Sequence, residues 1–140
     1  MKKHLAIAFK EYGVKEFVGQ RDNPEVLKYF DEIGFNGSKL KDETAWCSAF
    51  VNWVLKTSDA PYTGKLNARS WLQIGKETNC PQVGDIVVFW RGSKRSWKGH
   101  VGFFINAIDD KIFVLGGNQN NQVKISSYPK GRLLGYRVVA

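Results

Sequence analysis

Cys47 is the residue best placed by its sequence context to act as a nucleophile. It lies in the segment Trp-Cys-Ser-Ala-Phe (residues 46–50), at the start of a predicted helix. The first turn of a helix has unpaired backbone N–H groups and the positive end of the helix dipole, and both favour thiolate, the nucleophilic form of cysteine. The same N–H groups could stabilise the oxyanion that forms when a carbonyl is attacked. The alternative is a buried cysteine that packs as a small hydrophobe.

His100 is the candidate partner for this thiol. It opens the apolar segment Gly-His-Val-Gly-Phe (residues 99–103), in which strand alternation places His100 and Gly102 on one face. A helix start that carries Cys47 over this face would bring thiol and imidazole together as nucleophile and base. Otherwise His100 is a histidine whose polar groups are satisfied at a strand end. The other histidine, His4, lies near the first residue and is a poor candidate.

The segment Gly-Gly-Asn-Gln-Asn-Asn (residues 116–121) could supply the third member of a triad. It follows the apolar strand predicted at residues 111–115. If that strand pairs with the strand of His100, an amide oxygen at its far end could accept the imidazole N–H and fix its tautomer and orientation. Asn118 is the first choice for this role and Gln119 the second. The same composition is also typical of a hairpin turn.

A basic and aromatic loop, residues 90–98, directly precedes the segment with His100. It carries four positive charges and two tryptophans. Indole rings stack on sugars or nucleobases, and cations bind carboxylates or phosphates, so the loop could form the mouth of a site. The alternative is a solvated basic loop. The expected substrate-binding residues are Trp46, Trp90, Trp97 and Gln119.

The elements that would position these residues divide the chain into a helical first half and a strand-rich second half. Helical periodicity and cap residues predict helices near residues 5–12, from Asn23 to Gly34, from Asp42 or Thr44 through residue 55, and over residues 67–74. Segments rich in β-formers at residues 85–91, 100–107, 111–115, 123–128 and 133–139 predict an antiparallel meander. Helices followed by strands indicate an α+β protein with a sheet of about five or six strands.

Length and composition indicate one globular domain over residues 1–140. With 43% hydrophobic and 24% charged residues, the chain is neither disordered nor fibrous. No apolar stretch approaches the ~20 residues of a membrane span, and the start does not read as a secretory signal. The net charge of +8 implies an anionic partner, which could be nucleic acid, a membrane surface or a bacterial cell wall. Two cysteines fit no zinc motif, and no metal is expected.

Taken in order, these motifs resemble those of the CHAP and NlpC-type cysteine peptidoglycan hydrolases. The resemblance rests on the Trp-Cys pair at a helix start, on Gly-Asp-Ile-Val-Val-Phe (residues 84–89), and on residues 99–103 and 116–119. It extends to residues 13–29, covers nearly the whole chain, and is closest to a phage-lysin-like subgroup. It implies a papain-like α+β fold in which the cysteine helix packs on an antiparallel sheet that carries the histidine.

The same resemblance implies hydrolysis of an amide bond in bacterial peptidoglycan, without a metal or organic cofactor. Cys47 matches the nucleophile and His100 the base. CHAP members often place a Glu and then an Asn on the strand after the histidine strand; here Gly116 stands at the Glu position and Asn118 matches the Asn. The expected mechanism is attack by the thiolate on the carbonyl, protonation of the leaving amine by the imidazolium, and hydrolysis of the thioester by water.

The resemblance implies that the partner is peptidoglycan. The protein is expected to be a monomer that binds neither nucleic acid nor a membrane. A chain made in the cytoplasm without a signal peptide would reach the wall or periplasm after holin release, as a phage-type lysin, or by machine-mediated export, as an antibacterial effector with a cognate immunity protein. The alternatives are a basic nucleic-acid-binding module, a wall-binding module without catalysis, and another Cys-His acyl-transfer enzyme. The basic residues are spread along the chain and form no nucleic-acid reader motif.

Overall fold

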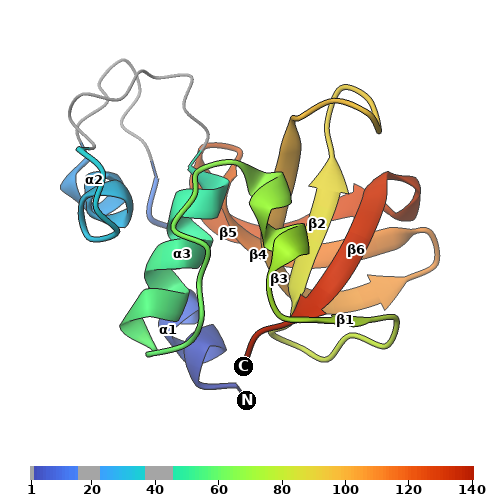
Figure 1. Cartoon of the computed structure of the whole chain (residues 1–140), viewed down its shortest axis with the longest axis horizontal. Helices are drawn as coiled ribbons and strands as arrows, with labels where there is room; N and C mark the ends of the chain where they lie inside the picture. The colour runs from blue at the N-terminus through green and yellow to red at the C-terminus, as the bar shows by residue number, and fades with distance from the viewer. Residues whose placement is uncertain (1, 16–22, 37–45) are drawn as a thin grey trace.

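The computed structural model describes residues 2–15, 23–36 and 46–140, and within them the three α-helices lie to one side of a six-stranded antiparallel sheet (Figure 1). The helices are α1 (Lys3–Lys10), α2 (Pro24–Asp31), α3 (Cys47–Thr57) and two short 3-10 helices, η2 (Ala68–Gln73) and η3 (Lys130–Arg132). The strands are β1 (Lys76–Thr78), β2 (Ile86–Trp90), β3 (Gly99–Ile108), β4 (Lys111–Gln119), β5 (Gln122–Pro129) and β6 (Leu133–Val138). The predicted α+β class is confirmed.

The strand order differs from a simple meander. The order is β1-β6-β2-β3-β4-β5, so β2 to β5 are successive neighbours as predicted, whereas β6 returns to lie between β1 and β2. The first strand was not predicted, because three residues carry too little alternation to indicate a strand. No helix among the described residues is long and apolar enough to cross a membrane.

The start of α2 follows from its local sequence. In α2 the Asn23 side chain accepts a hydrogen bond from the Glu25 backbone N–H at 3.0 Å, which confirms the predicted cap. For α3 the predicted caps, Asp42 and Thr44, lie outside the described residues. The residue before the first turn of α3 is Trp46, whose side chain makes no cap hydrogen bond.

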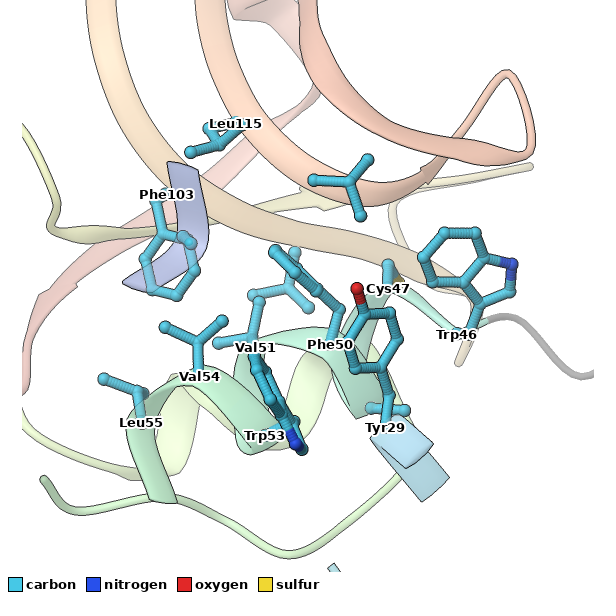
Figure 2. Packing of buried hydrophobic residues seen from close by; sticks show 14 of the residues in the cluster. Tyr29, Trp46, Cys47, Phe50, Val51, Trp53, Val54, Leu55, Phe103 and Leu115 are labelled. Carbon is cyan, nitrogen blue, oxygen red and sulfur yellow. The ribbon is translucent and has the colours of Figure 1, made fainter. Parts of the chain in front are cut away.

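The core forms where α3 packs against the sheet. Every residue from Cys47 to Leu55 is buried, so α3 is covered on all sides and is a central helix rather than a surface one. Figure 2 shows Phe50 and Val54 of α3 facing the strands that carry Phe103 and Leu115. Burying each such side chain contributes roughly 1.5–3 kcal/mol, which holds the first turn of α3 against the sheet.

A buried polar network fixes the rotation of α3 about its axis. Ser48 donates to the Lys65 carbonyl at 2.6 Å and accepts from the Trp71 indole N–H at 2.9 Å. One turn later, Asn52 donates to the same carbonyl at 2.9 Å and accepts from the Gly64 backbone N–H at 2.8 Å. Since these partners come from the segment after α3 and from η2, they hold α3, and with it Cys47, in one orientation.

The face of β3 that receives α3 is not the predicted one. We expected α3 over the face with His100 and Gly102, but Phe50 packs edge-on against Phe103, with ring centroids 6.4 Å apart, so α3 covers the opposite face. The face with His100 belongs to a second apolar cluster, which includes Phe89 and Phe104. Alternation correctly separated the two faces, but it could not say which of them meets the helix.

Candidate active site

The first turn of α3 and the start of β3 bring Cys47 and His100 together. Cys47 is the first residue of α3 and is 1% exposed. Its thiol hydrogen-bonds the His100 side chain and the backbone N–H of Val101 and Ser48. Burial would raise the pKa of the thiol, but the charge of His100 and these hydrogen bonds outweigh burial, and the pKa is lowered.

The imidazole shifts in the opposite direction. His100 is 5% exposed, and burial would lower its pKa. The negative charge and hydrogen bond of Cys47, followed by the hydrogen bond of Gln119, outweigh both burial and the nearby charge of Arg91, so the pKa of His100 is raised. Opposite shifts favour a thiolate beside an imidazolium, the charge state that a cysteine hydrolase uses.

Gln119 fixes the tautomer of His100. The Gln119 amide nitrogen donates to the carbonyls of Val114 at 3.1 Å and Lys124 at 2.6 Å, so both of its protons are engaged. The amide oxygen must therefore face His100, and it lies 2.9 Å from Nε2. Because an amide oxygen only accepts, Nε2 carries the proton, and Nδ1 is left for the Cys47 thiol.

A β-bulge explains why Gln119, and not Asn118, holds this position. Gly116 pairs with Lys124 and Gln119 with Gln122, so β4 has one more residue than β5 between these pairs. The extra residue turns Gln119 to the face that regular alternation would give to Asn118. Asn118 adopts a positive φ of 57°, which asparagine tolerates, and its side chain has no hydrogen bond to His100 in the described structure.

Gly116 leaves the space that the Gln119 amide fills. A Cβ atom at Gly116 would lie 2.8 Å from the Gln119 amide oxygen and 3.5 Å from His100 Nε2. CHAP members often have a glutamate at this position, and here the amide that lies beside the imidazole comes from three residues further along the strand. The amide next to His100 is therefore that of Gln119, the second choice made from the sequence, and not that of Asn118.

Tyr128 of β5 is a site residue that the sequence did not suggest. Its hydroxyl lies 3.1 Å from His100 Nε2 and donates to the Gln119 amide oxygen at 3.1 Å. Its ring stacks on the imidazole, with centroids 4.9 Å apart, and on Phe89 at 4.8 Å. No local motif marks this tyrosine, because its approach to His100 depends on the curvature of the sheet across β2, β3, β4 and β5.

The expected substrate-binding residues are divided between interior and surface. Trp46 is 2% exposed and stacks on Tyr29, with ring centroids 5.8 Å apart. Gln119 is also buried and contacts His100, so neither side chain is exposed to a substrate at the surface. Trp90 is half-buried and donates to the Gly131 carbonyl at 3.2 Å. Trp97 is 74% exposed. Surface contact with a substrate is therefore open to Trp90 and Trp97.

Other titratable groups in the described part of the chain do not add a second centre. Within the residues that the structure describes, no three His, Cys, Asp or Glu side chains gather where they could hold a metal ion. His4 is buried, and its Nε2 lies 2.6 Å from the Gly84 carbonyl oxygen. Asp85 accepts from the Gln82 backbone N–H at 2.7 Å, which is the turn role expected of an acid at a strand start. The arrangement can therefore do the chemistry of a nucleophile, a base and an orienting amide.

Comparison with known proteins agrees with this geometry. The sequence matches the CHAP domain over residues 39–118, more than half of the chain, and this span includes Cys47 and His100. A solved structure with a similar fold is a protein of the NLP/P60 family, described as similar to lipoprotein, from Staphylococcus aureus subsp. aureus Mu50. The TM-score is 0.55 at 16% identity, over 98% of this chain and 40% of that one, so the chain spans less than half of that protein.

No curated protein matches the chain in sequence. The family match and the shared fold both agree with the motifs on which the sequence resemblance rests. The chain belongs to the CHAP domain family, with the fold also seen in the NLP/P60 family.

Proposed function

We propose that this protein hydrolyses an amide bond of bacterial peptidoglycan with Cys47 as the nucleophile. Membership of the CHAP family supports a peptidoglycan hydrolase. The observation that carries the proposal is the buried thiol at a helix start, hydrogen-bonded to an imidazole whose other nitrogen is held by Gln119. The opposite pKa shifts of the pair support an activated nucleophile, and a merely structural cysteine needs none of these partners.

The proposed reaction has two steps. The Cys47 thiolate attacks the amide carbonyl carbon, a C–S bond forms, and backbone N–H groups at the start of α3 stabilise the oxyanion. The His100 imidazolium gives its proton to the nitrogen as the C–N bond breaks, which leaves a thioester and a free amine. Water then attacks the thioester while His100 takes its proton, and the C–S bond breaks to return the thiolate and release a carboxylate.

We propose that the loop between β2 and β3 contacts the anionic wall. Residues 86–108 contain no acid, and four loop cations have exposed positions next to Trp97: Arg91, Lys94, Arg95 and Lys98. The Arg69 guanidinium shapes the loop by donating to the carbonyls of Lys98 and Lys94 at 2.8 Å and of Ser93 at 3.0 Å. An ordered cationic loop with an exposed indole suits sugars that bear carboxylates or phosphates.

The setting of this activity follows from the substrate. An enzyme that cuts peptidoglycan acts at the cell wall or in the periplasm, and we propose it works there as a phage-type lysin or as an injected antibacterial effector. In the second case a cognate immunity protein would protect the producer by covering Cys47. Both settings use the same chemistry and the same net charge of +8 toward an anionic wall.

Digestion of purified peptidoglycan sacculi tests the proposal. Wild-type protein should release soluble fragments with new amine termini, identified by mass spectrometry, and Cys47→Ala should release none. Cys80→Ala is the matched control, because Cys80 is exposed and lies outside the site, so this variant should match the wild type. The fragment masses would name the bond that is cut.

Failure would be equally informative. No release by a folded, reduced wild-type sample on several wall types would contradict peptidoglycan hydrolysis. Acyl transfer to an added amine, with no hydrolysis, would instead favour a transamidase that uses the same Cys–His pair.

A further inference from the structure

Tyr128 completes a closed hydrogen-bonded triangle with the imidazole and the amide. Its hydroxyl lies 3.1 Å from both His100 Nε2 and the Gln119 amide oxygen, and these two atoms lie 2.9 Å from each other. The tyrosine ring is stacked between His100 and Phe89. The proposed reaction uses the thiol and the imidazole, and this hydroxyl takes part in neither of its steps.

Only one placement of the protons agrees with the hydrogen bonds of this triangle. Both protons of the Gln119 amide are used by carbonyls, so its oxygen accepts and Nε2 of His100 donates. The Tyr128 hydroxyl then donates its single proton to the same amide oxygen. Since Nε2 already carries a proton, the hydroxyl oxygen faces Nε2–H as a second acceptor. Burial and then the Cys47 charge raise the pKa of Tyr128, so the hydroxyl keeps this proton.

This pattern favours the charged imidazole. An oxygen lone pair that faces Nε2–H stabilises imidazolium more than neutral imidazole, and an aromatic ring stacked on the imidazole does so as well. The hydroxyl also gives the Gln119 oxygen a second donor, which keeps the amide aimed at His100. Both effects act on the imidazole and, through it, on the thiolate.

We propose that the Tyr128 hydroxyl is a positioning group that holds His100 in its Nε2–H tautomer and stabilises the thiolate–imidazolium pair. The proposal deepens the proposed hydrolytic function and rests on it for its role in catalysis. Among the described residues, the titratable or charged groups that act on His100 are Cys47 from α3, Arg91 after β2 and Tyr128 from β5. Tyr128→Phe changes the hydroxyl alone and retains the stacked ring.

The test is the rate of Cys47 alkylation by iodoacetamide against pH, measured in a Cys80→Ala background so that one thiol reports. For Tyr128→Phe we expect the midpoint of the thiolate titration to move upward by about half to one pH unit, the shift that corresponds to one lost hydrogen bond. We also expect kcat on sacculi to fall by about three- to tenfold, with KM unchanged.

Tyr136→Phe is the matched control, because Tyr136 packs on the same apolar cluster, against Phe104 and away from the imidazole. It should leave the alkylation profile in place. A Tyr128→Phe profile that coincides with the wild type would overturn the proposal. Alkylation does not involve peptidoglycan, so a shifted profile without hydrolysis of sacculi would retain the role of Tyr128 in the pair and reject the proposed function.

A measurement on the wild type covers the case in which Tyr128→Phe does not fold. Histidine-selective ¹⁵N NMR, with the His100 signals assigned by comparison with His4→Gln, should show His100 protonated at Nε2 above the pH at which imidazolium is lost. A nuclear Overhauser contact between the Tyr128 hydroxyl proton and that Nε2 proton should also be present. An Nδ1–H tautomer would overturn the proton placement, and with it the proposal.

Discussion

The opposite pKa shifts of Cys47 and His100 set the expected dependence of activity on pH. The thiol pKa is lowered and the imidazole pKa is raised, so the two shifts move toward each other and favour the thiolate beside the imidazolium at intermediate pH. As pH falls through the lowered thiol pKa, the nucleophile is protonated. As pH rises through the raised imidazole pKa, the acid that protonates the leaving amine is lost. We therefore expect a bell-shaped profile whose maximum lies below the ordinary thiol pKa of about 8.5.

Initial rates of fragment release from sacculi, measured between about pH 4 and pH 10, check this expectation. Alkylation of Cys47 should begin to rise on the acid side of the same maximum, because alkylation needs only the thiolate. A release rate that keeps increasing through the ordinary thiol pKa would mean an unperturbed cysteine and would contradict the ion pair.

Gln119 and Asn118 offer a direct comparison between neighbouring amides. Gln119→Ala removes an acceptor from a charged donor, which is worth about 1.5–3 kcal/mol, so kcat should fall by about 10- to 100-fold. Asn118→Gly removes the other amide while keeping the positive φ of 57° free of strain, and it should change kcat little. The reverse order of effects would return the orienting role to Asn118.

At the scale of single residues, the sequence predicted the pair of Cys47 and His100 but not all of the side chains around it. A thiol at a helix start and a histidine at a strand start depend on local periodicity, and the structure brings both together. The choice between Asn118 and Gln119 depends on a bulge of one residue, and local composition predicts the turn without its register. Tyr128 reaches His100 through tertiary structure alone.

At the scale of elements, the close approach of β4 to α3 positions the thiol. A Cβ atom at Gly117 would lie 2.8 Å from both Phe50 Cβ in α3 and a ring carbon of Trp46, the residue that precedes α3. Gly117→Ala must therefore push the strand and the helix apart. We expect a loss of about 1–3 kcal/mol in unfolding free energy, as for other overpacked sites, together with a fall in kcat because Cys47 moves relative to His100.

Urea unfolding and rates on sacculi measure the two effects. Gly131→Ala is the matched control, because a Cβ atom there would meet nothing within 4 Å. It should change neither quantity beyond about 0.5 kcal/mol. If Gly117→Ala and Gly131→Ala were equally stable, the close approach of β4 to α3 at Gly117 would not be required for stability.

The elements themselves were more predictable than their arrangement. Residues 86–128 form successive hairpins, in which each strand finds its partner nearby in sequence, and the meander prediction holds there. β6 instead pairs with β2 and β1 across long separations, for which local patterns give no signal. Likewise, alternation along β3 gives two faces, and only the apolar stripe of α3 as packed against Phe103 decides between them.

At the scale of the whole molecule, the net charge of +8 predicts attraction to an anionic wall, but total charge and local charge make different predictions. If the loop between β2 and β3 binds the wall, Lys94→Ala with Arg95→Ala should weaken the binding of inactive Cys47→Ala protein to sacculi by about three- to tenfold. Lys76→Ala with Lys111→Ala removes the same two charges from exposed positions elsewhere and should weaken binding much less.

Co-sedimentation of these proteins with sacculi at low and high salt separates the two causes. At ~1 M salt the screening length falls to about 3 Å, so the loop variant and the control should bind alike there if the contact is electrostatic. Trp97→Ala should then still bind more weakly, because stacking of its exposed ring survives high salt. Equal losses for both double variants at low salt would assign the attraction to the total charge, and the loop would have no specific role.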